Sequence, residues 1–162
     1  MRTFHTLLRI IVGGLFAGHG AQKLFGWFGG PGIEGTGGFF ESIGIKPGKQ
    51  AATVAGASET GGGLLLAAGI ATPLAGAALT GVMTQAMRSV HLEKGPWNSD
   101  GGWEFNVVMI AAVLAMVEED AGLLWALAAL AAGVAGPDLA LQALGKVDAD
   151  QPGQDAPIAA AA

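Results

Sequence analysis

Two ionisable side chains lie close together in an otherwise apolar stretch, GLFAGHGAQKLFGWFGGPG, at residues 14–32. His19 and Lys23 are four residues apart, so in a helix they share one face. Histidine can exchange a proton near neutral pH, and a lysine ammonium donates hydrogen bonds or pairs with a carboxylate. The stretch therefore offers proton-transfer and binding groups just before a turn rich in glycine and aromatic residues.

Other polar side chains interrupt the apolar segments that follow. Glu59 lies in SETGGGLL, and Glu104 opens the last of these segments. Between them, Gln85, Arg88 and His91 are spaced by three residues, so a helix places them near one another. If consecutive segments run up and down as antiparallel helices, these side chains converge with His19 and Lys23 at one end of the fold. The opposite end should then hold almost no polar groups.

Charged groups at membrane depth are costly, so they face a bundle interior and pair with one another. We expect Arg88 to pair with Glu59 or Glu104, with Lys23 as a second candidate. In such a cluster the proton-exchanging, catalytic residues are His19, Glu59, His91 and Glu104. The residues expected to bind a ligand are Lys23, Trp27, Gln85, Arg88 and Trp103.

Simpler interpretations of the same residues stay open. The ionisable groups could form a buried ion-pair network that only fixes helix register. The tryptophans could form an aromatic belt at a membrane interface. His19, His91, Glu59 and Glu104 could ligate a divalent ion on paper, but their spacing matches no ligand motif and nearby cations oppose it. We therefore expect no metal, haem or nucleotide.

The composition indicates a membrane protein. The 162-residue chain is 51% hydrophobic and 13% charged, with a mean hydropathy of +0.50, whereas soluble domains are about 25% charged. There is no cysteine, which excludes disulfides, iron–sulfur clusters, covalent c-type haem and thiol chemistry by this chain. No basic patch with interleaved aromatic residues is present, so nucleic acid is not an expected partner.

The elements that must position these residues are four apolar segments of about 20 residues, long enough as helices to cross a bilayer. A further apolar stretch, 121–136, looks too short to span comfortably, and it could be interfacial, re-entrant or a tilted fifth crossing. Thr36 could cap a short helix that ends near Gly44, and Thr72-Pro73 joins the second and third segments by a tight turn. We predict an all-α, four-helix up-and-down membrane bundle over 1–145 and a disordered tail at 146–162. The predicted helices are 4–24, 51–71, 74–92 and 103–118, with an extra short apolar helix at 121–136.

Several motifs in combination resemble the DoxX family of small integral membrane proteins. They are HGAQKLFGWFGGPGIEGTGGFFESIGIKP, AGASETGGGLLLAAGIATPLA, MRSVHLEKG and GGWEFN, which lie within residues 8–118. The resemblance implies a four-helix bundle in the cell membrane, associated with membrane redox or thiol-stress complexes. It also places His19, Lys23, Glu59, His91 and Glu104 on the polar motif positions of the family. The apolar stretch at 121–136 departs from the family pattern.

Two functions compete on these grounds. In the first, the chain is a redox-associated subunit that binds a quinone-like molecule in the polar cluster and receives electrons from a partner subunit. In the second, it is a non-enzymatic scaffold or assembly factor that docks a soluble redox partner through the loops 26–50 and 93–102. Gly14 and Gly18 form a GxxxG pattern, which suits close helix packing within the chain or between copies in a homo-oligomer.

Overall fold

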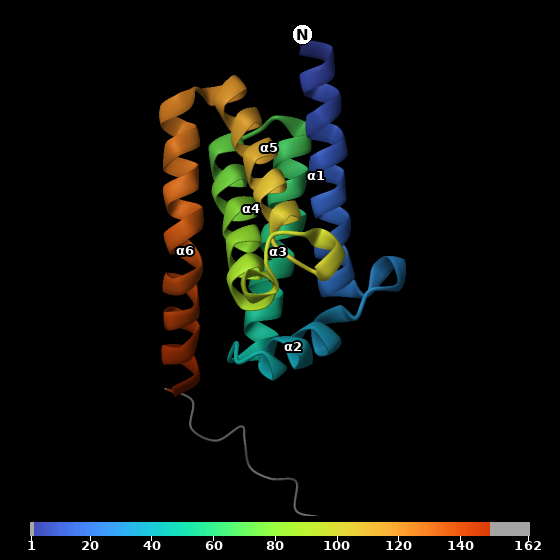
Figure 1. Ribbon diagram of the computed structural model, residues 1–162, viewed down its shortest axis with the longest axis vertical. Coiled ribbons are helices and arrows are strands. Elements are labelled where there is room, and N and C mark those ends of the chain that lie inside the picture. The colour runs from blue at the N-terminus through green and yellow to red at the C-terminus, as the bar shows by residue number, and fades with distance from the viewer. Residues whose placement is uncertain (1, 150–162) are drawn as a thin grey trace, which may run out of the picture.

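The computed structural model describes residues 2–149, and within this range the chain forms helices and turns without a strand (Figure 1). The predicted all-α fold is therefore confirmed. Short helical turns connect some of the longer helices: η1 (Trp27–Gly29), η2 (Met87–His91), η3 (Leu92–Lys94) and η4 (Asn98–Asp100). The longer helices are α1 (Arg2–Phe25), α2 (Gly32–Ser42), α3 (Gly48–Ala68), α4 (Thr72–Ala86), α5 (Glu104–Ala121) and α6 (Leu123–Ala149).

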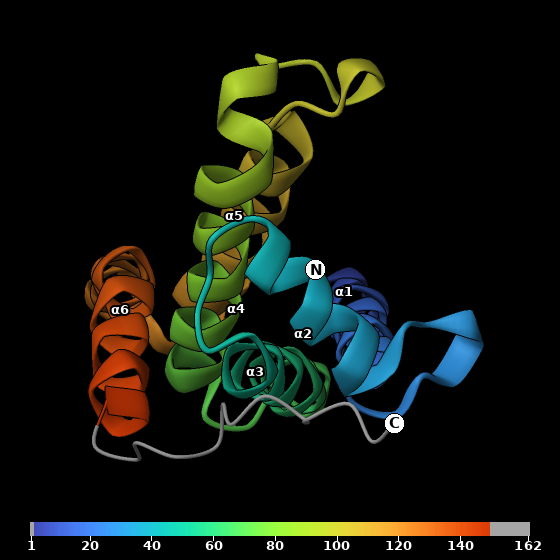
Figure 2. The ribbon, with the colours of Figure 1, turned by 90° about the horizontal axis from the view of Figure 1, so that it is seen from below.

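The helices α1, α3, α4, α5 and α6 run up and down along one long axis, and α2 lies across their lower ends (Figure 1; Figure 2). As the alternation of segments predicts, the carboxyl ends of α1 and α4 and the amino ends of α3 and α5 lie toward this lower end, here called the α2 end. The opposite end, where Gly122 links α5 to α6, is the α5–α6 end. Any site built from the polar residues must therefore form near the α2 end.

A hydrophobic core lies toward the α5–α6 end. Its fully buried members include Leu66 late in α3, Leu79 midway along α4 and Met116 late in α5. Phe16 of α1 is also buried in this core, with 3% of its surface exposed. Close packing of such side chains holds the helices together through van der Waals contacts. The large apolar side chains thus fix the bundle at one end and leave room between the helices toward the α2 end.

Close packing of α1 on α3 depends on glycines of α1. A β-carbon on Gly20 would lie 2.5 Å from the backbone nitrogen of Thr60, and one on Gly13 would lie 2.7 Å from a backbone nitrogen of α3. The GxxxG glycines, Gly14 and Gly18, do not make this contact, because a β-carbon on either would have no neighbour within 4 Å among residues 2–149. The alternative in which these two glycines pack within the chain is therefore wrong. GxxxG spacing marks a face of small residues, but it does not say which helix covers that face.

The extra apolar helix is longer than the sequence suggests. We expected a short helix at 121–136, whereas α6 runs from Leu123 to Ala149 and continues through Pro137. Gly136 and Pro137 are stop signals for an isolated helix. Here α6 packs along α4 (Figure 1), and this contact supports the helix beyond the proline. The predicted tail starts at 146, but 146–149 belong to α6, and 150–162 lie outside the described residues.

Two predicted loop features have different outcomes. Pro73 lies in the first turn of α4, as predicted. The expected cap at Thr36 is wrong, because α2 already begins at Gly32 and Thr36 is buried within it. The helix starts earlier because Pro31 precedes it with a helical backbone, φ −78° and ψ −10°. Proline has this φ built in, so it can begin a helix without a side-chain cap.

Among the described helices, one contains a segment that is long and apolar enough to cross a bilayer. This segment, Leu123–Gly145 of α6, has a mean hydropathy of 1.6, and 17% of it is buried in the fold. The predicted crossing helices are less apolar or shorter: α1 contains Arg9 and Lys23, and α4 has 15 residues before its last turn opens into the π-helical η2. Four crossings are therefore not established by hydropathy.

Candidate functional site

An ion pair between α1 and α3 anchors the candidate site. Lys23 Nζ lies 2.5 Å from Glu59 Oε2, and it donates a hydrogen bond to that oxygen. Glu59 is 2% exposed, whereas the Lys23 side chain is 24% exposed. The close approach of the helices at Gly20 and Thr60 brings the last turn of α1 beside the middle of α3. The expected pairing of Glu59 with Arg88 is thus wrong, and Lys23, the second candidate, is the partner.

His19 and His91 are each held by one hydrogen bond at Nδ1. His19 Nδ1 lies 3.1 Å from Gln22 Oε1, and His91 Nδ1 lies 2.6 Å from the carbonyl oxygen of Gly101. Because each partner is an oxygen acceptor, Nδ1 carries the proton in both rings. In the neutral imidazole, Nε2 is then the basic nitrogen. Both rings therefore keep one nitrogen able to take up a proton.

Five of the nine predicted site residues line one cavity of about 580 Å³. The five are His19, Lys23, Glu59, Gln85 and His91. Most of the remaining lining is apolar and comes from all six of the described α-helices, for example Phe16, Phe40, Met83, Met109 and Leu141. A pocket of this size, mainly apolar with a few polar groups, is typical of a site for a small organic ligand. The polar groups present can donate hydrogen bonds and exchange protons.

The cavity also contains polar groups whose hydrogen-bonding capacity is not used by the protein. Gln85 donates from Nε2 to Ser89 Oγ at 2.7 Å, but its buried Oε1 has no hydrogen-bond partner within the described residues. A buried oxygen without a partner costs about 1–3 kcal/mol. A ligand with a donor group or an ordered water would relieve this cost. Gln85 is thus a suitable contact for a polar ligand group.

The other four predicted residues lie outside the cavity lining. Arg88 pairs with Asp138 of α6, with Nη1 3.1 Å from Oδ2. Glu104 accepts a hydrogen bond from the backbone nitrogen of Asn98 at 2.7 Å and so holds the loop before α5. Trp103 is the residue before α5, and its backbone nitrogen donates to the Gly95 carbonyl. Arg88 and Glu104 therefore stabilise neighbouring elements.

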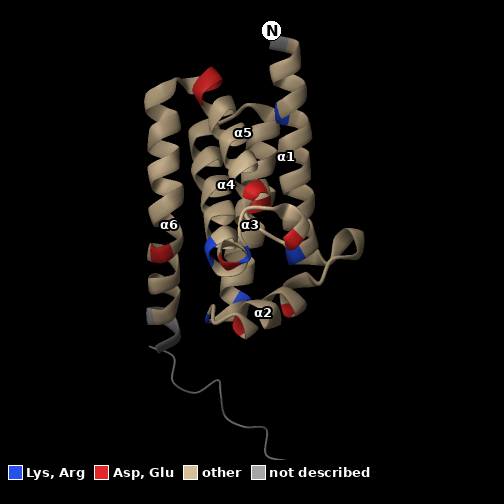
Figure 3. Cartoon of the chain, in the orientation of Figure 1, with Lys and Arg blue, Asp and Glu red and all other residues tan. Residues whose placement is uncertain are grey.

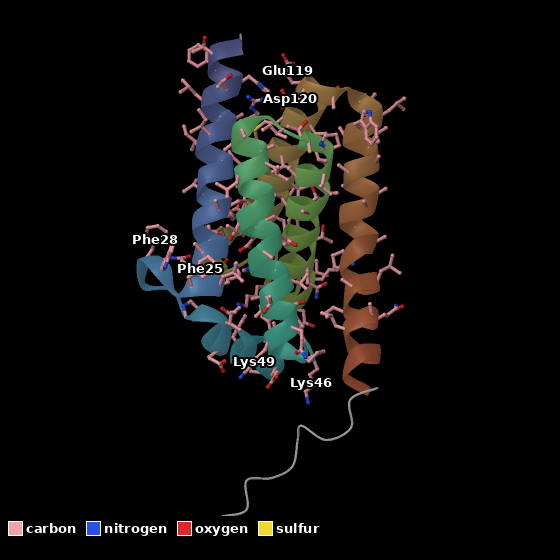
Figure 4. All side chains as sticks on the ribbon, turned by 180° about the vertical axis from the view of Figure 1, so that it is seen from behind. Phe25, Phe28, Lys46, Lys49, Glu119 and Asp120 are labelled. Atoms are coloured by element: carbon pink, nitrogen blue, oxygen red, sulfur yellow. The ribbon has the colours of Figure 1, made fainter. Side chains whose placement is uncertain are left out.

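Trp27 is the fourth predicted site residue outside the cavity lining. It lies in an aromatic turn that projects from the bundle (Figure 2). Its ring is 59% exposed and stands 5.1 Å from Phe25 and 6.4 Å from Phe28 between ring centroids. Figure 4 shows Phe28 at the outer edge of the fold, with Phe25 beside it at the end of α1. The turn therefore does not cover the cavity, and its position suits the alternative interpretation as an aromatic belt.

Sequence reasoning missed Asn106. This residue is 4% exposed, lines the cavity and lies near Met83, with Nδ2 3.5 Å from the Met83 carbonyl oxygen. The signal was available, because Asn106 is a lone amide within an apolar segment and follows Glu104 by two residues. The rule that polar residues in apolar helices face the interior applies to it as well.

A second polar cluster lies at the α5–α6 end, where almost none was expected (Figure 3). Arg9 Nη1 donates to both carboxylate oxygens of Asp120 at 2.9 Å, and His5 Nδ1 lies 3.8 Å from Asp120 Oδ1. Figure 4 places Asp120 beside the upper part of α1. The predicted helix ends at 118, before Asp120, so no contact between this carboxylate and α1 was expected. In the fold it joins α5 to α1.

Metal ligation is a use of these residues that their spacing and the nearby cations disfavour. Among the described residues, no three histidine, aspartate or glutamate side chains gather as a metal site would require. Glu59 is paired with Lys23, while His91 and Glu104 contact the loop before α5. The groups proposed as ligands on paper thus make other contacts.

The comparisons with known proteins identify a family over more than half of the chain. The DoxX family model matches residues 4–92, which run from α1 through η2. The matched region contains the five predicted residues on the cavity, whereas Asn106 and α6 lie beyond it. No protein with a curated description and no solved structure matches the chain.

Proposed function

Since the chain belongs to the DoxX family, which indicates a membrane protein, we propose that it is a multi-pass protein of the cell membrane. In this arrangement α1, α3, α4, α5 and α6 cross the bilayer and α2 lies at its surface. A helix rises about 1.5 Å per residue, so the 24 residues of α1 and the 27 of α6 are long enough to cross the hydrocarbon core. Large apolar side chains also cover the outer surfaces, among them Ile11, Leu15, Leu74, Val108 and Leu124.

We further propose that the cavity binds a quinone-like, lipid-soluble molecule and that the chain serves as a redox-associated subunit. The observation that supports this most is the single cavity of about 580 Å³ that joins an apolar lining to the Lys23–Glu59 pair and two histidines. A quinone ring requires an apolar slot and hydrogen-bond donors at its carbonyl oxygens. The cavity provides both features.

The residues would then have distinct roles. His19 and His91 would donate or accept protons at Nε2, because Nδ1 is held in each ring. Lys23 would donate a hydrogen bond, and Glu59 would relay protons and hold the ammonium group in place. The sequence has no cysteine, so the proposal assigns electron delivery to a partner subunit or a bound reductant.

Bound quinone in purified protein would test this directly. The protein is extracted into nanodiscs with its native lipids, and quinone is quantified by native mass spectrometry against empty nanodiscs. We expect bound quinone in the wild type and its loss in His19→Ala and Glu59→Gln. His5→Ala, at the opposite end of the bundle, is the matched control and should retain it. Wild-type protein with no more quinone than empty nanodiscs would overturn the proposal.

A scaffold function is the second candidate, and one observation favours it. The loops that flank the α2 end expose tryptophans: Trp27 is 59% exposed and Trp97 is 63% exposed. Tryptophan is enriched at protein interfaces. If the chain is a scaffold, a soluble partner should co-purify with the wild type and with His19→Ala alike. Trp97→Ala should release that partner. Co-purification without bound quinone would favour this second function.

A further inference from the structure

The lining residues of α4 cover two neighbouring faces of that helix, and each face borders a part of the cavity here called a lobe. Successive residues of a helix are about 100° apart, so lining residues can be sorted by face. Met83, Ala86 and Val90 share one face of α4, and Met83 packs with the core residues of α1 and α5. Ala78 and Val82 lie on the neighbouring face, with the polar Gln85 below them near the α2 end. The first face borders a lobe with α1 and α5, here called the polar lobe, which contains Lys23 and Glu59.

The second lobe, here called the α6 lobe, lies between α3, α4 and the lower half of α6. The lining residues of α6 are Ala132, Gly136, Pro137, Ala140, Leu141 and Leu144, all on the side that packs toward α4. On α3, Val54 lies on the far side from α1, because Gly56 and Gly63 of α3 make the contacts with α1. Val54 is 44% exposed, so the lobe reaches the surface beside it.

The upper half of α6 packs too tightly to hold a ligand. A β-carbon on Gly133 would lie 2.6 Å from Thr80 Cβ, and one on Gly76 would lie 2.6 Å from Val117 Cγ2 and 3.3 Å from Ala129 Cβ. Below Gly133 the small residues of α6 line a space instead. Along their whole length α3 and α6 make little contact with each other. The Arg88–Asp138 pair joins the lower half of α6 to η2.

We propose that the α6 lobe is a separate subsite for a long apolar chain, such as an isoprenoid or acyl chain, and that the chain enters from the bilayer between α3 and α6. The proposal rests on the function above, in which the polar group of the same ligand lies in the polar lobe. Both lobes belong to one cavity, so a single ligand can occupy them together. The side chains of Ala78, Gly81, Gly136 and Ala140 in the lining of this lobe are small and apolar, which suits a flexible apolar chain. The gap between α3 and α6 faces the proposed hydrocarbon layer, where such a chain resides.

A photoreactive probe can locate the chain. The probe is a quinone with a ten-carbon chain that carries a terminal diazirine, and it is added to the full-length protein in nanodiscs. After irradiation, peptide mass spectrometry should find labels on the lower half of α6 and beside Val54, and excess decylubiquinone should remove them. Ala140→Leu fills the lobe and should abolish this labelling. The matched control is Ala135→Leu, on the exposed side of α6, which should leave the labelling unchanged.

The outcomes separate the two proposals. Labels on α1 and α5 alone that compete with decylubiquinone would overturn the α6 lobe and leave quinone binding intact. No competed label on any helix would overturn quinone binding itself, and this inference with it. If a chain ending at residue 149 gained labelling on α6 while the full chain showed none, residues 150–162 would be the natural occupant, and the inference would also be overturned.

The entry route can be tested because the chain has no cysteine. The double variant Val54→Cys/Leu141→Cys carries one thiol on α3 and one on α6. Thiol crosslinkers of increasing length, each with a cleavable disulfide, bridge the two. Bridging should prevent labelling by probe added afterwards, and reduction should restore it. The same double variant without crosslinker is the reference, and its labelling sets the level that reduction should restore. Equal labelling with the bridge in place would refute entry between α3 and α6.

Discussion

The ion pair between Lys23 and Glu59 leads to an asymmetric prediction. Lys23→Met leaves the Glu59 carboxylate 2% exposed and without its ammonium partner. Glu59→Gln leaves Lys23, whose side chain is 24% exposed, and its flexible stem can carry the ammonium group to water or headgroups. We therefore predict that Lys23→Met destabilises the fold more than Glu59→Gln does.

The magnitudes follow from the geometry. Two unit charges 2.5 Å apart attract by about 7 kcal/mol at an effective dielectric constant of about 20. Desolvation of each ion costs several kcal/mol and offsets much of this attraction, so loss of one partner typically costs about 3–5 kcal/mol. We expect that range for Lys23→Met. For Glu59→Gln we expect about 1.5–3 kcal/mol, the range for loss of one hydrogen bond to a charged group.

The assay is a double-mutant cycle on the free energy of unfolding in mixed micelles, followed by the fluorescence of the four tryptophans. The double variant should recover about 2 kcal/mol relative to the sum of the single variants, as directly contacting residues do. Lys49→Met is the matched control. Lys49 pairs with Glu34 at 2.7 Å, but these side chains are 62% and 79% exposed, so its loss should cost less than about 1 kcal/mol. Equal effects of Lys23→Met and Lys49→Met, or strict additivity in the cycle, would refute the reasoning.

Three further predictions concern the contacts that hold the helices together. Gly13→Leu should destabilise the fold by at least about 3 kcal/mol, because the leucine side chain would meet the α3 backbone. Gly14→Leu should be nearly neutral. Similar unfolding free energies for the two variants would contradict the packing of α1 on α3. Arg9→Met removes the contact with Asp120 and should cost about 1–3 kcal/mol in the same assay, and an unchanged stability would show that this contact does not hold α1 to α5. Arg88→Met should change the unfolding free energy by less than about 1 kcal/mol, since the pair with Asp138 is exposed. It should nevertheless speed amide hydrogen exchange in residues 136–145. Unchanged exchange there would mean that the pair does not secure the lower half of α6.

Local sequence patterns were sufficient for the helices and for part of the cavity lining. Apolar segments of helical length predicted the regions of α1, α3, α4 and α5, and alternation along the chain predicted which helix ends meet. The spacing of His19 and Lys23 placed them on one face of α1, and both line the cavity. These features depend on residues that are close together in the chain, so local geometry determines them.

Contacts between distant residues decided the rest. Glu59 pairs with Lys23 because α1 packs directly on α3 through Gly20. Arg88 pairs with Asp138 of α6, a helix that we expected to end at 136. The length of α6 depends on its packing along α4, which the stop signals at Gly136 and Pro137 conceal. A charge can be recognised in the sequence as requiring a partner. The partner is determined by which helices pack closely enough to bring the two groups within a few ångströms.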